Sequence, residues 1–145
     1  MTTIAWDGLM LAADKQASVA DSIAIAPVKI RRLNDGTLIG CAGNSMLCEM
    51  IIKWVAEKGE RPAILSDKEE WCPAIEVTPE GKVFFHGQYG RNEIIVPFFA
   101  IGSGGHFAMG AMGFGANAAQ AVEVASRLDP FSGCGIDCLA LGGSQ

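Results

Sequence analysis

The residue with the clearest chemical potential stands at the second position of the chain. Thr2 follows the initiator methionine, and its small side chain permits removal of that methionine, which would expose Thr2 as the N-terminus. An N-terminal threonine combines a nucleophile with a base, because its α-amino group, with an ordinary pKa of about 7.7–8.0, can accept the proton of its own hydroxyl. Many proteins begin with Met-Thr, however, so this position alone is weak evidence of an enzyme.

Three further residues would complete a catalytic centre if the fold brought them to Thr2. A nearby cation lowers the pKa of the α-amine toward the working pH, and Lys29 is the candidate. Asp14 would orient that lysine, and the backbone N–H of Gly40 would stabilise the developing oxyanion. Taken singly, each residue has a simpler explanation: a solvated basic strand for Lys29, a turn for Asp14 and close packing for Gly40. The hypothesis therefore depends on their convergence.

A predicted hairpin at the start of the chain brings two of these residues together. Asp7 and Gly8 are a strong two-residue turn signal between two short apolar segments. Counting outward from that turn pairs Thr2 with Ala13. Asp14 would then lie next to the beginning of the chain.

A second predicted hairpin brings the other two together. The turn cluster at residues 34–36 separates segments 28–33 and 37–42. A two-residue loop places Lys29 opposite Ala42, and a three-residue loop places it opposite Cys41. In either register Lys29 lies beside the small residues that follow Gly40.

The remaining elements are predicted from periodicity and turn residues. We expect a helix from Asn44 or Ser45 to about Lys58 and a third hairpin across residues 79–81. The other predicted elements are a solvated turn or short helix at 66–70, a buried strand at 94–101, a helical region at 106–128 interrupted near 113–115, and a last strand at 135–141. Strands and helices do not alternate, so this order predicts an α+β fold.

Several segments resemble the N-terminal-threonine peptidases, which include the proteasome β subunits and the peptidase of the bacterial ATP-dependent protease HslUV. The similar segments follow one another in the family's order through nearly the whole chain. They are Thr2-Thr3-Ile4, Ala12-Ala13-Asp14, and residues 29–33, 40–43, 100–105, 129–133 and 136–137.

The resemblance implies one domain over residues 1–145, folded as a four-layer αββα sandwich. It implies that Thr2 is the nucleophile, Lys29 tunes its amine, Asp14 pairs with Lys29, and Gly40 donates to the oxyanion. The polar set around the amine would be Ser103, Asp129 and Ser132. The implied reaction is peptide-bond hydrolysis through an ester on Thr2 Oγ, which requires no metal and no other cofactor.

The resemblance also implies an assembly and a pocket. We expect a cytoplasmic homo-oligomeric ring that takes peptides or unfolded proteins, with an ATPase unfoldase as a possible partner. Ala17, Ala20 and residues 43–45 would lie near the substrate pocket. The short segment after the first helix and the compressed loop after Asp14 suggest a compact variant of the family without a long propeptide, whose Thr2 is exposed by removal of Met1 alone.

Composition excludes several other classes. Half of the 145 residues are hydrophobic and 19% are charged, enough apolar material for a packed core, and the net charge of −5 argues against a nucleic-acid partner. Residues 94–122 lack charges, but six glycines and a proline interrupt them, so no membrane span is expected. Residues 102–105 lack the lysine and serine that end a phosphate-binding loop.

The five cysteines have no disulfide framework, and no second Cys or His cluster completes a metal site with Cys134 and Cys138. We expect these two to be small buried residues.

Two alternative functions are open at this stage. If Met1 is retained, Thr2 has no free amine, and the chain would be a catalytically silent structural ring subunit. A small-molecule amidase with the same nucleophile is the other, and acyl-amide or lactam substrates would distinguish it from a peptidase.

Overall fold

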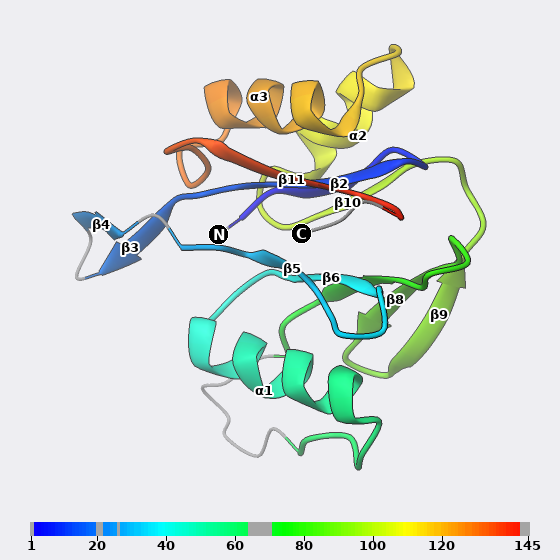
Figure 1. The fold of residues 1–145 in the computed structure, drawn as a ribbon. Helices are drawn as coiled ribbons and strands as arrows, with labels where there is room; N and C mark the ends of the chain where they lie inside the picture. Colours follow the sequence, from blue (N-terminus) through cyan, green and yellow to red (C-terminus); the bar gives the residue numbers. More distant parts are fainter. Residues whose placement is uncertain (1, 20–21, 26, 64–70, 143–145) are drawn as a thin grey trace.

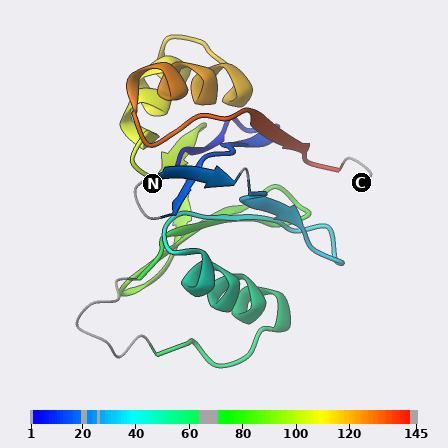
Figure 2. The same ribbon diagram turned by 90° about the vertical axis from the view of Figure 1, so that its left-hand side faces the viewer.

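The computed structural model describes residues 2–19, 22–25, 27–63 and 71–142, which form four layers in the order helix, sheet, sheet, helix (Figure 1). Helix α1 (Ser45–Glu57) covers one sheet, and α2 (Gly105–Gly113) with α3 (Ala118–Leu128) covers the other. Figure 2 shows the same stacking from the side, with the helices at opposite ends. This arrangement confirms the predicted α+β class and αββα sandwich.

Both large sheets are antiparallel throughout the described residues. The first has the order β10-β1-β2-β11, and the second the order β5-β6-β7-β8-β9. The strands of the first are β1 (Ile4–Trp6), β2 (Met10–Asp14), β10 (Phe99–Ile101) and β11 (Ile136–Ala140). Those of the second are β5 (Ile30–Arg32), β6 (Leu38–Cys41), β7 (Ala74–Val77), β8 (Val83–Gly87) and β9 (Gly90–Ile94). A small hairpin, β3 (Ala17–Val19) and β4 (Ser22–Ile25), extends from the sandwich.

The central strands are buried on both faces, which explains their almost unbroken apolar sequences. Side chains such as Ile4 and Leu38 fill the core between the two sheets. Alanines such as Ala5 and Ala12 face α2 and α3, where their small size lets the helices pack closely on the sheet. Ile39 belongs to a third core beneath α1.

The register of the first hairpin differs from the prediction. Ile4, not Thr2, pairs with Ala13, because the turn is longer than two residues. The Asp7 carboxylate accepts hydrogen bonds from the backbone N–H groups of Leu9 and Met10, each at 2.8 Å. Its other oxygen accepts from the N–H of Ala118 at 2.8 Å, which ties the turn to the start of α3. The shift by two residues keeps every side chain on its predicted face.

The other local predictions agree better with the structure. The second hairpin has the three-residue loop, with Leu33 N–H donating to Thr37 O at 2.7 Å and Ile30 opposite Gly40. Asn44 caps α1 by accepting from the N–H groups of Met46 and Leu47. The third hairpin, the interrupted helical region and the last strand are also confirmed. Residues 66–70 lie outside the described part of the chain.

The apolar run at 94–101 is not a single buried strand. Ile94 ends β9 in the second sheet, and Phe99 begins β10 in the first, so the run crosses between sheets. Ile95 is 89% exposed at the crossing. Pro97 lacks a backbone N–H, which favours a break in the strand at this point. Strands β3, β4 and most of β9 were not predicted.

Cys134 and Cys138 are exposed, so the prediction that they are buried is wrong. Cys138 lies on β11, which forms an edge of the first sheet. An edge strand leaves side chains uncovered that a central strand would bury. Within the described residues, no helix has the length and apolarity needed to cross a bilayer.

Candidate active site

A chain of hydrogen bonds leads from the backbone nitrogen of Thr2 to a carboxylate. The Thr2 nitrogen donates to Ser103 Oγ at 3.2 Å, and Ser103 Oγ donates to Asp129 Oδ2 at 2.6 Å. Ser132 Oγ donates to the same oxygen at 2.7 Å. Burial disfavours ionisation of Asp129, but the hydrogen bonds from the two serines outweigh it, and the pKa of this carboxyl lies below its ordinary value. Met1, whose removal would free the amine, lies outside the described residues.

A buried ion pair forms the second part of the site. Lys29 Nζ lies 2.8 Å from Asp14 Oδ1, and the two side chains are 8% and 0% exposed. The Asp14 carboxylate also accepts from three backbone N–H groups, those of Thr3 at 2.9 Å, Gln16 at 3.1 Å and Gly133 at 3.0 Å. A carboxylate with four donors is fixed in position, and it fixes the lysine in turn.

Thr3 joins the two parts. Its N–H donates to Asp14, and its hydroxyl lies 2.8 Å from Ser132 Oγ. The strand pairing explains this position, because Asp14 N–H donates to Thr3 O at 3.1 Å across the first hairpin. Thr3 was not predicted as a site residue; the correct hairpin register, which places it beside Asp14, would have identified it.

The loop before α2 holds the backbone of Thr2 closely. Gly104 N–H donates to Thr2 O at 3.3 Å. Gly102 has a φ of +94°, and a Cβ atom there would lie 1.9 Å from Thr2 O. Both its conformation and its close approach to Thr2 therefore require glycine.

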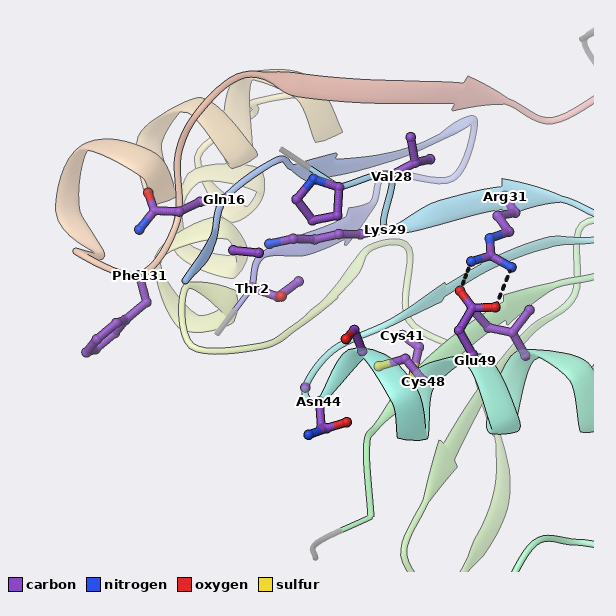
Figure 3. A pocket seen from close by; sticks show the side chains of 15 residues that line it. Thr2, Gln16, Val28, Lys29, Arg31, Cys41, Asn44, Cys48, Glu49 and Phe131 are labelled. Carbon is purple, nitrogen blue, oxygen red and sulfur yellow. Dashed lines mark hydrogen bonds and ion pairs between the residues drawn. The ribbon is translucent and has the colours of Figure 1, made fainter. Parts of the chain in front are cut away.

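A pocket of about 470 Å³ opens beside Thr2 and Lys29 (Figure 3). Its lining includes Ala17 and residues 43–45, as predicted, whereas Ala20 lies outside the described residues. The wall toward α1 is mixed, with Cys41, Cys48 and Ile52 as apolar lining residues beside polar ones, and Phe131 stands at the opposite side.

An ion pair on the pocket wall consists of Arg31 and Glu49, from β5 and α1 (Figure 3). Hydrogen bonds from the Arg31 guanidinium hold the pKa of Glu49 below its ordinary value. The two side chains are 39% and 58% exposed, so water screens the pair, and the wall presents little unbalanced charge to the pocket.

Gly40 lies near the site but is not among the residues that line the pocket. It is in β6 between Ile30 and Ile75, and a Cβ atom there would come within 2.8 Å of the Ile30 side chain. Ala42 N–H donates to Pro73 O, and N–H groups alternate sides along a strand, so the Gly40 N–H also points toward β7. Its predicted role as oxyanion donor stays a prediction.

Comparisons with solved structures identify the fold. HslV from the eukaryote Trypanosoma brucei matches with a TM-score of 0.74 and 23% identity over 96% of this chain and 98% of that one. BPH from Thiobacillus denitrificans in complex with epoxomicin gives a TM-score of 0.73 at 21% identity, covering 96% of both chains. A second BPH structure gives a TM-score of 0.70 at 19% identity, also over 96% of both. This chain has the N-terminal nucleophile hydrolase fold.

No protein-family model and no curated protein sequence matches the chain. At these identities the similarity to solved structures establishes the fold and leaves the chemistry to be argued from the site. Coverage of 96–98% of both chains gives no support to the prediction of a compact variant. In the described ranges, no cluster of three or more histidine, cysteine or acidic side chains is arranged to hold a metal ion.

Proposed function

We propose that the protein is a threonine-type peptidase whose nucleophile is Thr2 after removal of Met1. The observation that carries the proposal is the meeting of two networks at one residue: the Ser103–Asp129–Ser132 set bonded to the Thr2 nitrogen, and the Lys29–Asp14 pair beside it. Thr2 and Lys29, one member of each network's contacts, line a pocket large enough for a substrate side chain.

In the proposed acylation step, the free amine of Thr2 accepts the proton of Thr2 Oγ, directly or through water, while Oγ attacks the carbonyl carbon of the substrate. The positive charge of Lys29 favours the neutral amine before the step. A backbone N–H of segment 40–43 that faces the pocket would hold the oxyanion; the sequence resemblance implies Gly40, whose N–H points toward β7. The protonated amine then donates its proton to the leaving nitrogen, and an ester on Thr2 remains.

In the proposed deacylation step, the same amine takes a proton from water while the water oxygen attacks the ester carbonyl. The bond from the carbonyl carbon to Thr2 Oγ then breaks, the carboxylic acid product leaves, and the protonated amine returns the proton to Oγ. The Ser103–Asp129–Ser132 set keeps the amine oriented through both steps, because Ser103 bonds to it and Asp129 fixes both serines. Every acid and base in this cycle is a group of the chain itself.

The comparisons support this proposal indirectly. BPH from Thiobacillus denitrificans has a solved complex with epoxomicin, and HslV shares the fold with this chain. We further propose that residues 1–145 form one domain of a homo-oligomeric ring that takes peptides or unfolded proteins, with an ATPase unfoldase as a possible partner. Exposed apolar side chains on α1 and α2 suit such contacts, among them Met46 at 77% exposed and Phe107 at 41%.

Hydrolysis of fluorogenic peptides by the purified protein tests the function. Peptides with a good leaving group at the carboxyl side of an apolar residue should be cleaved, and Thr2→Ala should abolish the cleavage. Cleavage of acyl-amides or lactams but not of peptides would favour the amidase instead. If neither class is cleaved by a protein that has lost Met1, the proposal is wrong.

A further inference from the structure

Three cysteines meet in the wall of the pocket, outside the network proposed for catalysis. Cys41 ends β6, Cys48 lies in α1, and Cys72 precedes β7, and all three are buried. The three side chains lie close together, and Cys72 Sγ donates to the carbonyl oxygen of Asn44 at 3.9 Å. Together with the apolar side chains under α1 they form one core cluster.

Cys41 and Cys72 lie on the same face of the second sheet. Cys41 pairs with Ala74 across β6 and β7, and Cys72 is two residues before Ala74, so both side chains point toward α1. Cys41 Sγ lies 3.6 Å from the carbonyl oxygen of Cys72. Cys48 approaches this pair from the helix opposite.

The pocket gives small molecules a route to this cluster. Cys41 and Cys48 line it directly. Gly43 lines it as well, and a Cβ atom at Gly43 would lie 2.6 Å from Cys72 Sγ. Cys72 does not line the pocket itself, but its sulfur lies against Gly43, a lining residue that has no side chain.

The contacts among the thiols favour ionisation of one of them. Hydrogen bonds from Cys41 and then Cys48 hold the pKa of Cys72 well below the ordinary value of a thiol. Hydrogen bonds to Cys48 and Cys72, together with burial, raise the pKa of Cys41. A thiolate is the form of cysteine that reacts with peroxides, and a neighbouring thiol is what converts the first product into a disulfide.

We propose that this cluster is an oxidation site in which a peroxide converts Cys41 and Cys72 into a disulfide. The Cys72 thiolate attacks one oxygen of hydrogen peroxide, the O–O bond breaks, and the sulfur becomes a sulfenic acid while hydroxide leaves and is protonated to water. Cys41 Sγ then attacks the oxidised sulfur, an S–S bond forms, and a second water leaves with the thiol proton of Cys41. Cys48 is not consumed, because it faces the pair from the helix and does not share the sheet face.

The disulfide would change the pocket beside Thr2, a consequence that rests on the proposed peptidase function. Cys41 is one of the residues that line the pocket, and movement of its side chain toward Cys72 would pull on the segment that continues through Gly43. Peptidase activity should therefore fall severalfold on oxidation and return on reduction with dithiothreitol.

The experiment uses a Cys134→Ser/Cys138→Ser variant, which removes the two exposed thiols and leaves the cluster. After treatment with hydrogen peroxide, we expect the intact chain to lose two titratable thiols and a mass of two hydrogen atoms. Cleavage after Met46 separates Cys41 from Cys48, so mapping without reduction should find Cys41 linked to Cys72. In the same background, Cys48→Ser should keep the bridge, whereas Cys72→Ser and Cys41→Ser should each abolish it.

The proposal is overturned if the three thiols remain reduced, if they end as sulfinic or sulfonic acids without a bridge, or if the bridge joins Cys48. Mapping of the Cys134→Ser/Cys138→Ser protein decides this even if a core variant fails to fold. The mass readout does not depend on peptidase activity, so an inactive protein that forms the bridge would refute the proposed function and leave the oxidation site standing.

Discussion

The ion pair between Lys29 and Asp14 provides the sharpest test of how the site is built. Asp14→Asn leaves the Lys29 ammonium, 8% exposed, without the carboxylate that lies 2.8 Å away. The amide NH2 would also face groups that are themselves donors: the N–H groups of Gln16 and Gly133 if it replaces Oδ2, or the Thr3 N–H and the Lys29 ammonium if it replaces Oδ1. Removal of one partner of a buried pair costs about 3–5 kcal/mol of folding stability, a large share of the roughly 5–15 kcal/mol that a domain has.

The converse substitution should cost less. In Lys29→Met, Asp14 keeps its three backbone N–H donors, and methionine retains most of the aliphatic volume of the lysine. We expect a loss of about 1.5–3 kcal/mol, the range for one hydrogen bond to a charged group. The double variant should lose less than the sum of the single variants by more than about 1 kcal/mol, because the two residues are in direct contact.

Urea unfolding followed by tryptophan fluorescence measures all three values, with Trp6, Trp54 and Trp71 as reporters. The measurement is made at two protein concentrations, since an oligomer gains apparent stability with concentration. If Asp14→Asn cost less than about 1 kcal/mol, or less than Lys29→Met, the pair would not be the buried anchor described above.

Three further predictions concern neighbouring residues. Thr2→Ala should lower the peptidase rate by on the order of 10³-fold or more and leave the urea midpoint unchanged, and retention of full activity would refute the assignment of the nucleophile. Gly102→Ala should abolish activity and destabilise the fold, because the new Cβ lies 1.9 Å from Thr2 O at a φ of +94°, whereas Gly110→Ala, with open space around it, should do neither. The lowered pKa of Asp129 favours the folded chain above about its ordinary value of 3.8, and this contribution is lost as the pH falls through the lower folded-state pKa. Asp129→Asn should therefore lose less stability than the wild type between pH 5 and about pH 2, and identical acid profiles would contradict that coupling.

Elements whose ends are set by neighbouring residues could be predicted from the sequence. The loop at residues 34–36 fixes the second hairpin, and Asn44 supplies the cap that begins α1. The register of the first hairpin was mispredicted because its turn depends on a distant residue. Asp7 bonds to Ala118, 111 residues away, and that contact selects the longer turn. Local turn preferences contain no information about such a partner.

Periodicity predicted that residues 94–101 are extended and apolar, but not which sheet each part joins. A strand buried between two sheets and a run that crosses from one to the other have the same apolar sequence. The local sequence also does not show that β11 lies at a sheet edge. The exposure of Cys134 and Cys138 was mispredicted for this reason.

The residues of the candidate site also fall into two groups: those that local sequence could predict and those that it could not. Thr2, Asp14 and Lys29 come from two hairpins near the start of the chain. Turn counting placed Asp14 near Thr2 even though the predicted register was shifted by two residues. Ser103 and Asp129 were predicted only through the family resemblance, because their approach to Thr2 spans about a hundred residues of chain. Thr3 and the backbone of Gly133 were missed, since their roles depend on the exact register and on a loop closing over Asp14.

The central claim is that Thr2 becomes an N-terminal nucleophile, and the intact mass of the purified protein tests it most directly. The mass is measured before and after incubation with an epoxyketone, a probe that requires both the amine and the hydroxyl of an N-terminal threonine. We predict a chain without Met1 that gains one probe molecule, and no gain for Thr2→Ala. A chain that has lost Met1 but gains no probe, or a Thr2→Ala chain that gains it, would contradict the claim. A chain that retains Met1 and gains no probe would point to the silent ring subunit instead.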